Sequence, residues 1–244
     1  MQMKKVFPVL ACALVSLPAS ALNIVFNYDA SSYFYTEERR DALDRAAAEY
    51  EKYITNDVNI FVTLTSARDT NYLASAGPFD WYDNFQSDWG GIITFNESEN
   101  WYSGTSESFS GFDLFSVAIH ELGHVLGFGI LVPWTSLVVD GYFIGENSVS
   151  LYGGPVPLGP ENGSRYDHWN EYLISTLPGT ETWQMVSYSP YAYPGERRYL
   201  TDLDLAGLKD MGWAVAVPEP EMLYMLLSGL GLVGIAARRR RHVA

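Results

Sequence analysis

The sequence predicts an α+β domain framed by two terminal segments of different character. Three observations carry this prediction: apolar residues alternate in Val58–Leu64, Phe112–Leu126 has the apolar surface of a buried helix, and Thr201–Met211 reads as a capped final helix. Between the terminal segments lie about 192 residues, Leu22–Trp213. That length is sufficient for one domain with a hydrophobic core.

The N-terminal half alternates between strand and helix patterns. Leu22–Tyr28 reads as a first strand, and Glu37–Ile54 has apolar residues at helical spacing, with Thr36 as its cap. Val58–Leu64 and Gly90–Phe95 predict the second and third strands.

The C-terminal half contains a long segment without clear periodicity. Glycine and proline are frequent in Gly127–Gly163, so we expect this segment to be mostly loop. In the final helix, Thr201 serves as the cap, Asp202 and Asp204 suit the positive end, and Gly212 ends the helix.

A His-Glu-x-x-His motif lies within the apolar segment Phe112–Leu126. Its residues are His120, Glu121 and His124. Residues four apart share one face of a helix, so both imidazoles point at one spot, as a zinc ion requires. Glu121 follows His120 closely enough to act as the general base on a water held there. The motif therefore indicates a catalytic zinc site.

Zinc requires a third protein ligand. The short-spacer pattern would place it at position 130, but Ile130 cannot bind metal. The chain has four histidines, and His242 lies in a basic tail, so elimination favours His168. The alternative ligands are three acidic residues: Asp140, Asp167 and Glu171.

The motif, the segment that follows it and the pair His168–Trp169 resemble the leishmanolysin-type metzincins. The resemblance implies a metzincin-like (zincin) catalytic domain with a mixed sheet, an active-site helix and a C-terminal helix. It also implies a Zn²⁺ cofactor and a peptide or protein substrate. The ligands are then His120, His124 and His168, with Glu121 as the catalytic base.

The same resemblance implies three further features. Metzincins carry a methionine in a turn below the metal, for which Met185 is the candidate and Met211 the alternative. Tyr188 is a possible oxyanion stabiliser, although it lies three residues from Met185 and not two. The strand before the zinc helix, Ile92–Asn96, would form the edge of the sheet and pair with extended substrate.

Residues 1–21 read as a signal peptide. Lys4 and Lys5 precede the apolar Val6–Leu17, and Ala19–Ala21 offers a small-residue cleavage site. Lipid attachment at Cys12 is the alternative, but it would leave a very short apolar region. Cleavage would remove the only cysteine, so disulfides are excluded from the mature chain.

Residues 214–244 read as a second targeting segment. A Val-Pro-Glu-Pro motif at 217–220 precedes an apolar run at 222–237 and four arginines at 238–241. This order resembles the PEP-CTERM sorting signal, which implies recognition by an exosortase and contact with the inner membrane through 222–237. The chain is then exported and reaches the cell envelope or the exterior. A simple membrane anchor is the alternative.

The charge of the body excludes one class of partner. Residues 22–216 hold 27 Asp and Glu against 9 Lys and Arg, so the net charge is about −18. Without a basic patch, nucleic acid is not expected to bind. Acidic residues cluster at Asp80, Asp83 and Asp88, so calcium is a second candidate ion, and a solvated acidic loop is the alternative.

These observations together predict an exported zinc-dependent endopeptidase. The alternative is a non-catalytic envelope or matrix surface protein that retains a metal-bound metzincin fold. Glu121 distinguishes the two, because a structural metal site does not use a general base beside its first ligand. A metal-dependent hydrolase of non-peptide bonds is a third candidate.

Overall fold

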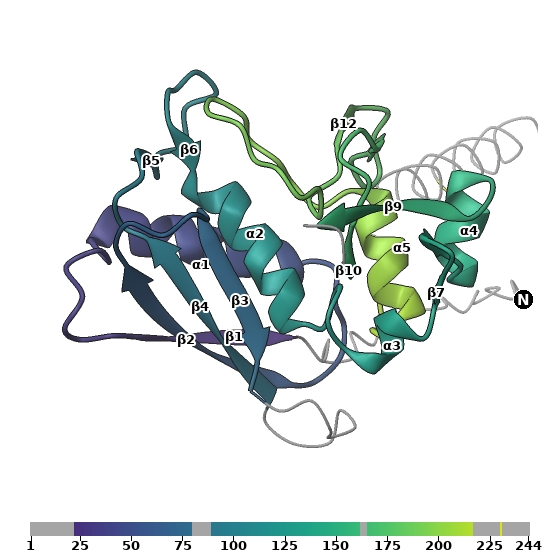
Figure 1. Cartoon of the computed structure of the whole chain (residues 1–244), viewed down its shortest axis with the longest axis horizontal. Coiled ribbons are helices and arrows are strands. Elements are labelled where there is room, and N and C mark those ends of the chain that lie inside the picture. Colours follow the sequence, from purple (N-terminus) through teal and green to yellow (C-terminus); the bar gives the residue numbers. More distant parts are fainter. Residues whose placement is uncertain (1–21, 80–88, 162–164, 217–229, 231–244) are drawn as a thin grey trace, which may run out of the picture.

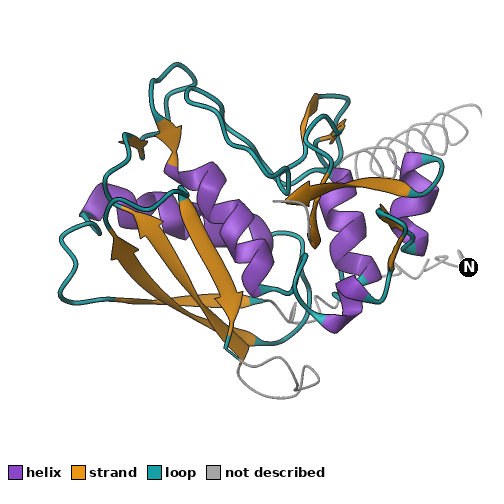
Figure 2. Ribbon diagram, in the orientation of Figure 1, coloured by secondary structure: helices purple, strands orange, loops and turns teal. Residues whose placement is uncertain are grey.

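The structure is a computed structural model that describes residues 22–79, 89–161, 165–216 and residue 230. Its larger part is a four-stranded sheet with two long helices, and its smaller part contains short strands and the remaining helices (Figure 1). Figure 2 shows the same view with helices in purple and strands in orange. The protein is therefore a mixed α+β domain with a mixed sheet, as expected from the sequence.

The four-stranded sheet has the order β1-β2-β4-β3, and β3 is antiparallel to the other strands. Alternate residues of β2, namely Ile60, Val62 and Leu64, are fully buried, whereas those between them are half-buried. One face of the sheet thus forms the core, which is the reason for the alternation in the sequence. The strands are β1 (Asn23–Tyr28), β2 (Asn59–Ala67), β3 (Ala74–Pro78) and β4 (Trp89–Asn96).

The two edges of the sheet are β1 and β3, so the prediction that Ile92–Asn96 forms the edge was wrong. β4 lies between β2 and β3 and pairs with both. The segment Ala74–Pro78 has small residues, a glycine and a proline, which do not read as a strand. Pairing with β4 makes it one, and proline is tolerated at such an edge.

Helix α1 (Glu37–Glu51) confirms the first predicted helix. The Thr36 hydroxyl accepts a hydrogen bond from the Arg39 amide and caps it. The helix ends before the expected Ile54, because Ile54 forms a bridge with Val215 and belongs to the core outside the helix. The Tyr50 hydroxyl donates to the Ile119 carbonyl and ties α1 to the second long helix.

Helix α2 (Leu114–Val125) carries the His-Glu-x-x-His motif. It begins after the expected Phe112, because β6 (Phe112–Asp113) pairs with β5 (Trp101–Tyr102). Asp113 then caps the helix by accepting from the Ser116 amide. Nearly every residue of α2 is buried, so the helix is fixed from all sides.

The segment 127–163 is richer in structure than expected. It contains α3 (Val132–Thr135), β7 (Val138–Val139), β8 (Tyr142–Phe143), α4 (Glu146–Tyr152) and β9 (Val156–Glu161). With β10 (Arg165–Trp169), the strands form a sheet in the order β10-β9-β8-β7. The elements are too short for periodicity to reveal them. Aromatic rings stabilise them instead: Phe128, Trp134, Phe143 and Trp169 pack together.

The last elements are β11 (Ile174–Thr176), β12 (Trp183–Met185) and α5 (Asp202–Asp210). A reciprocal capping box between Thr201 and Asp204 starts α5, which confirms the predicted final helix. Gly212 follows with a φ of 101°, a conformation that favours glycine.

Several predictions fall outside the described residues. They are the signal peptide 1–21, the acidic residues Asp80, Asp83 and Asp88, and the targeting segment 217–241 apart from residue 230. Within the described ranges, no helix has the length and apolar character to cross a membrane.

Candidate metal centre

Two turns of α2 and the end of β10 bring three histidines together. The Nε2 atoms of His120 and His124 are 3.1 Å apart, as the i, i+4 spacing predicts. His168 on β10 places its Nε2 3.0 Å from that of His120 and 3.1 Å from that of His124. Among the described residues, these three form the group that could hold a metal ion.

The second ring nitrogen of each histidine faces an acceptor. Nδ1 of His120 is 2.9 Å from the Ser187 carbonyl, and Nδ1 of His124 is 2.8 Å from the Phe128 carbonyl. Nδ1 of His168 is 3.0 Å from an Asp167 carboxylate oxygen. An acceptor at Nδ1 keeps the proton there, so the Nε2 lone pairs of all three rings point inward.

Burial keeps two of these rings neutral. Burial, followed by the neighbouring His168, lowers the pKa of His124 to about 4. Burial, followed by His124 and His168, also holds the pKa of His120 well below its usual value. Both rings are therefore unprotonated at Nε2 at neutral pH, which is the form that binds a metal ion.

The arrangement fits zinc. Two nitrogens bound tetrahedrally at about 2.0–2.1 Å lie roughly 3.3 Å apart, close to the spacing of these Nε2 atoms. Three imidazoles also form a donor set that leaves a fourth position for water. Without a cation, the three lone pairs would repel one another.

The group that could hold a metal ion includes none of the three alternative acidic ligands, Asp140, Asp167 and Glu171. Asp167 faces Nδ1 of His168, on the side of the ring away from the other histidines. Although burial alone would raise the pKa of Asp167, its hydrogen bond with His168 holds that pKa below its usual value. Asp140 has a φ of 49° and lies in the turn between β7 and β8.

Glu121 lines a cleft beside the histidines. Its side chain is 6% exposed, and the cleft has a volume of about 420 Å³. The walls come from three places: the segment Asn71–Ala74 at the start of β3, helix α2, and the segment Ser187–Arg198. The general-base candidate and one imidazole therefore face the same space.

Tyr188 lies beneath the histidines rather than in the cleft. It is fully buried, its ring stacks on Phe128 at 3.6 Å, and its hydroxyl bonds to that of Tyr50. Its ring centre is 6.1 Å from that of His120. An oxyanion stabiliser must reach the substrate, so this position does not suit that role.

Met185 lies in β12, where it pairs with Ile174. Its sulfur accepts a hydrogen bond from the Arg198 guanidinium at 3.6 Å. The aromatic ring of Tyr188, and not this thioether, packs against Gly123 between the two helix histidines.

Asp204 supports the site from α5, a role that the sequence did not reveal. Its buried carboxylate accepts hydrogen bonds from the amide of Ser187 at 2.9 Å and from the indole of Trp169 at 3.1 Å. Ser187 holds His120, and Trp169 follows His168. One carboxylate thus connects the supports of two histidines, although its capping position in the sequence indicated a structural role alone.

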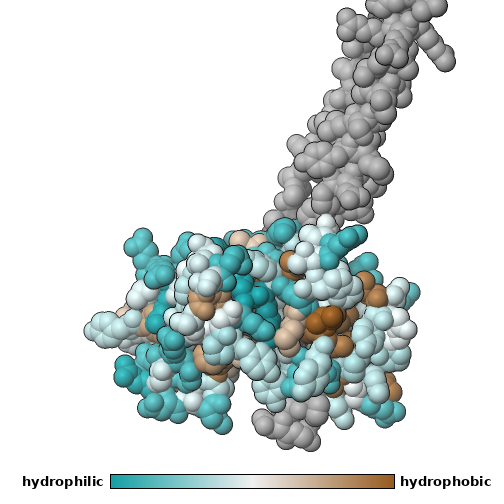
Figure 3. Space-filling model, turned by 90° about the horizontal axis from the view of Figure 1, so that it is seen from above, coloured by the Kyte–Doolittle hydropathy of each residue, from teal (hydrophilic) through white to brown (hydrophobic). Residues whose placement is uncertain are grey.

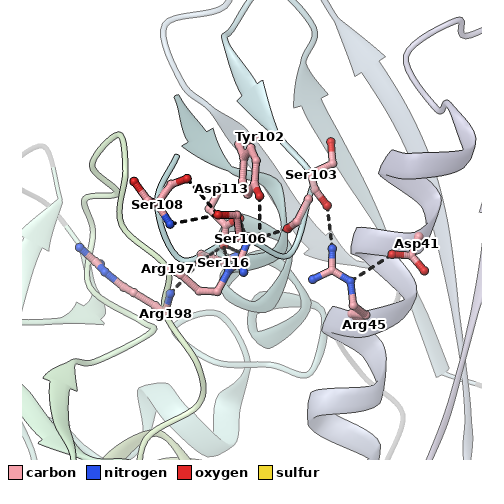
Figure 4. A network of polar contacts seen from close by, with 11 residues as sticks. Asp41, Arg45, Tyr102, Ser103, Ser106, Ser108, Asp113, Ser116, Arg197 and Arg198 are labelled. Carbon is pink, nitrogen blue, oxygen red and sulfur yellow. Dashed lines mark hydrogen bonds and ion pairs between the residues drawn. The ribbon is translucent and has the colours of Figure 1, made fainter. Parts of the chain in front are cut away.

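A polar network holds the far wall of the cleft to the start of α2 (Figure 4). The Arg197 guanidinium donates to both oxygens of Asp113, at 2.8 and 3.0 Å, and to the Gly104 carbonyl. The Ser116 hydroxyl donates to Asp113 and accepts from the Arg198 amide. The residue that caps the histidine helix therefore also anchors the segment that closes the cleft.

Comparison with known families gives two matches. The matrixin family model matches residues 48–150. This match points to a zinc metallopeptidase and covers His120, Glu121 and His124, while His168 lies beyond it. A PEP-CTERM protein-sorting motif matches residues 216–241 and points to an exported protein. Neither match confirms the resemblance to the leishmanolysin-type metzincins. No curated protein matches the chain.

Breaking the Arg197–Asp113 pair should destabilise the fold. Their side chains are 6% and 1% exposed, so Arg197→Met leaves a buried carboxylate without its counter-ion and should cost about 3–5 kcal/mol in the free energy of unfolding. Arg68→Met is the matched control, because Arg68 pairs with Glu97 while 77% exposed, and it should cost less than about 1 kcal/mol. Equal effects in urea unfolding would contradict this account.

Gly123→Ala should disturb the base of the site. A Cβ at this position would lie 1.8 Å from a ring carbon of Tyr188, so the ring must move off Phe128 and away from His120. We expect a loss of about 1–3 kcal/mol in stability and weaker zinc binding in a competition titration. Gly154→Ala, where a Cβ meets nothing within 4 Å, should change neither quantity.

Proposed function

We propose that the chain is an exported zinc-dependent endopeptidase. The observation that carries the proposal is the convergence of three inward-facing imidazoles beside Glu121 in one cleft. The match to the matrixins supports the same class of enzyme. The catalytic domain is residues 22–213, with the ion held by His120, His124 and His168.

A zinc ion in this position supplies a Lewis acid that polarises a substrate carbonyl and lowers the pKa of water. The chain's own residues supply the rest. Glu121 takes a proton from the attacking water and then delivers one to the leaving amine. Its low exposure keeps bulk water from the carboxylate and strengthens its interaction with charge that develops in the cleft.

The substrate backbone is placed along β3 in this proposal. β3 is an edge strand of the sheet, and it and the residues before it form one wall of the cleft. An edge strand has free amides and carbonyls that can pair with an extended peptide. Ala74 and His120 line the same cleft, so a peptide paired with β3 runs past the metal position.

Two features of the site favour catalysis over a structural metal role. A structural zinc site is closed by four protein ligands, whereas three ligands converge here and the cleft reaches one of them. The second feature is Glu121, which lies beside the histidines, where a general base is needed.

Glu121→Gln tests the role of the base. The variant should keep about one zinc per chain and lose turnover by roughly 10²–10⁴-fold on an unfolded protein, because proton transfer is lost while the ligands remain. Glu107→Gln, in an exposed loop, is the control and should leave turnover unchanged. A Glu121→Gln chain that loses its zinc, yet works normally once zinc is restored, would contradict the assignment.

We also propose that residues 1–21 direct export and that residues 214–244 are recognised by an exosortase-type enzyme, with 222–237 contacting the inner membrane. The PEP-CTERM match supports this role for the tail. Calcium binding and a fixed location in the envelope stay predictions.

Replacing Pro218–Pro220 by alanines should change how the tail is processed. The apolar run and the arginines remain, so the segment can still anchor the chain, but its recognition motif is lost. We expect a shift in the size and location of the chain in cell fractions. If neither changes, the tail is a simple membrane anchor.

A further inference from the structure

The β11–β12 hairpin presents an apolar face to solvent. Antiparallel pairing places Ile174 opposite Met185 and Thr176 opposite Trp183, and alternate residues point to the same side of a sheet. Leu173, Ser175 and Val186 point to the other side and are buried. Ile174 is 53% exposed and Trp183 is 63% exposed, so the outer face is apolar and open.

This face is connected to the cleft by a chain of contacts. Met185 accepts a hydrogen bond from Arg198, and the Arg198 guanidinium lies 6.0 Å from the ring centre of Tyr193. Arg198, Tyr191 and Tyr193 all line the cleft. The hairpin face is therefore continuous with the wall of the proposed active site.

Three tyrosines extend the surface. Tyr191 and Tyr193 are each about half exposed, and Tyr172, just before β11, is 79% exposed. Tyr172 lies two residues before β11, and Tyr191 and Tyr193 lie on the wall of the cleft. We call the following five residues the hairpin patch: Tyr172, Ile174, Trp183, Tyr191 and Tyr193.

Figure 3 shows the upper face of the molecule, on which apolar residues are brown and hydrophilic residues teal. A brown group lies on the right half of this face. Tyrosine and tryptophan have slightly negative hydropathy values, so the rings of the hairpin patch are drawn pale, and their exposure identifies them instead. Single exposed apolar residues are ordinary, but a group beside a cleft marks an interaction surface.

The exposed charges around the hairpin patch are acidic. Between residues 171 and 198 the charged residues are Glu171, Glu181, Glu196, Arg197 and Arg198. The two arginine side chains are 6% and 7% exposed and bind Asp113 and Glu196, whereas Glu196 is 43% exposed. A partner of this surface therefore meets aromatic rings with a negative rim, which favours basic groups.

We propose that the hairpin patch binds the part of an extended polypeptide substrate that leaves the cleft, and that it favours segments combining aromatic or aliphatic residues with lysine or arginine. The occupant follows from the continuity of the patch with the cleft, and the preference follows from its rings and acidic rim. The inference rests on the proposed function, because it takes the cleft to be the place where a peptide is cut.

Binding of synthetic copolymers tests the inference without turnover. The full-length Glu121→Gln chain, loaded with zinc, is titrated into labelled random copolymers of lysine and tyrosine or of glutamate and tyrosine. We expect tighter binding of the lysine copolymer by at least about tenfold. Trp183→Ala and Tyr172→Ala, each in the Glu121→Gln chain, should weaken that binding by roughly tenfold.

Tyr33→Ala, in the same Glu121→Gln chain, is the matched control. Tyr33 is 98% exposed but lies between β1 and α1, so its removal should leave the affinity unchanged. Far-ultraviolet circular dichroism checks that each variant is folded.

Three results would overturn the inference. The first is unchanged lysine-copolymer binding in the Trp183→Ala and Tyr172→Ala variants, and the second is equal binding of both copolymers. The third is a change in oligomeric state with Trp183→Ala and unchanged copolymer binding, which would assign the patch to a second copy of the chain. Failure of the proposed function has a different signature, because the chain with Glu121 intact would then cut no peptide while the copolymer affinities are still measured.

A second readout separates this role from a structural one. In the chain with Glu121 intact, Trp183→Ala should raise KM several-fold for a long unfolded protein and leave kcat unchanged. A short peptide that spans only the cleft should show no change in either constant. A loss of kcat on both substrates would instead mean that Trp183 holds the active site together, and the inference would be wrong.

Discussion

The convergence of three imidazole lone pairs on one point is the constraint on which the rest of the structure depends. Each ring is turned inward by an acceptor at its Nδ1: the Ser187 carbonyl, the Phe128 carbonyl and the Asp167 carboxylate. Lone pairs that converge at such short range repel one another unless a cation lies between them. Holding the three rings in this arrangement therefore lowers the stability of the folded chain, and a bound metal ion removes the repulsion.

The surrounding elements explain how that geometry is maintained. Asp113 caps α2 and binds Arg197, so the start of the histidine helix and the wall of the cleft are one unit. Asp204 connects α5 to Ser187 and Trp169, and Tyr188 packs on Gly123 below the rings. A buried carboxylate destabilises the fold unless hydrogen bonds or a counter-ion compensate its charge. Asp113 and Asp204 are both compensated in this way.

The sequence predicted those parts of the fold and of the site that depend on interactions between residues close together in the chain. The spacing of His120 and His124, the alternation in β2 and the capping box of α5 act within a few residues, so they could be read directly. His168 followed from elimination, because few histidines are available. The role of Asp204 depends on partners 17 and 35 residues away, and pairing with β4 turns Ala74–Pro78 into an edge strand. Neither leaves a local signal, and the resemblance that suggested an oxyanion role for Tyr188 gave no indication of its burial against Phe128.

The most direct test of the metal centre is zinc X-ray absorption on the purified chain, combined with a zinc titration of the His168→Ala variant. The account predicts one zinc per chain with three histidine nitrogens and one oxygen ligand at about 2.0–2.1 Å. It also predicts that the variant loses one histidine from the zinc shell and binds zinc far more weakly. A spectrum with two histidines and carboxylate ligands, unchanged in the His168→Ala variant, would contradict the account.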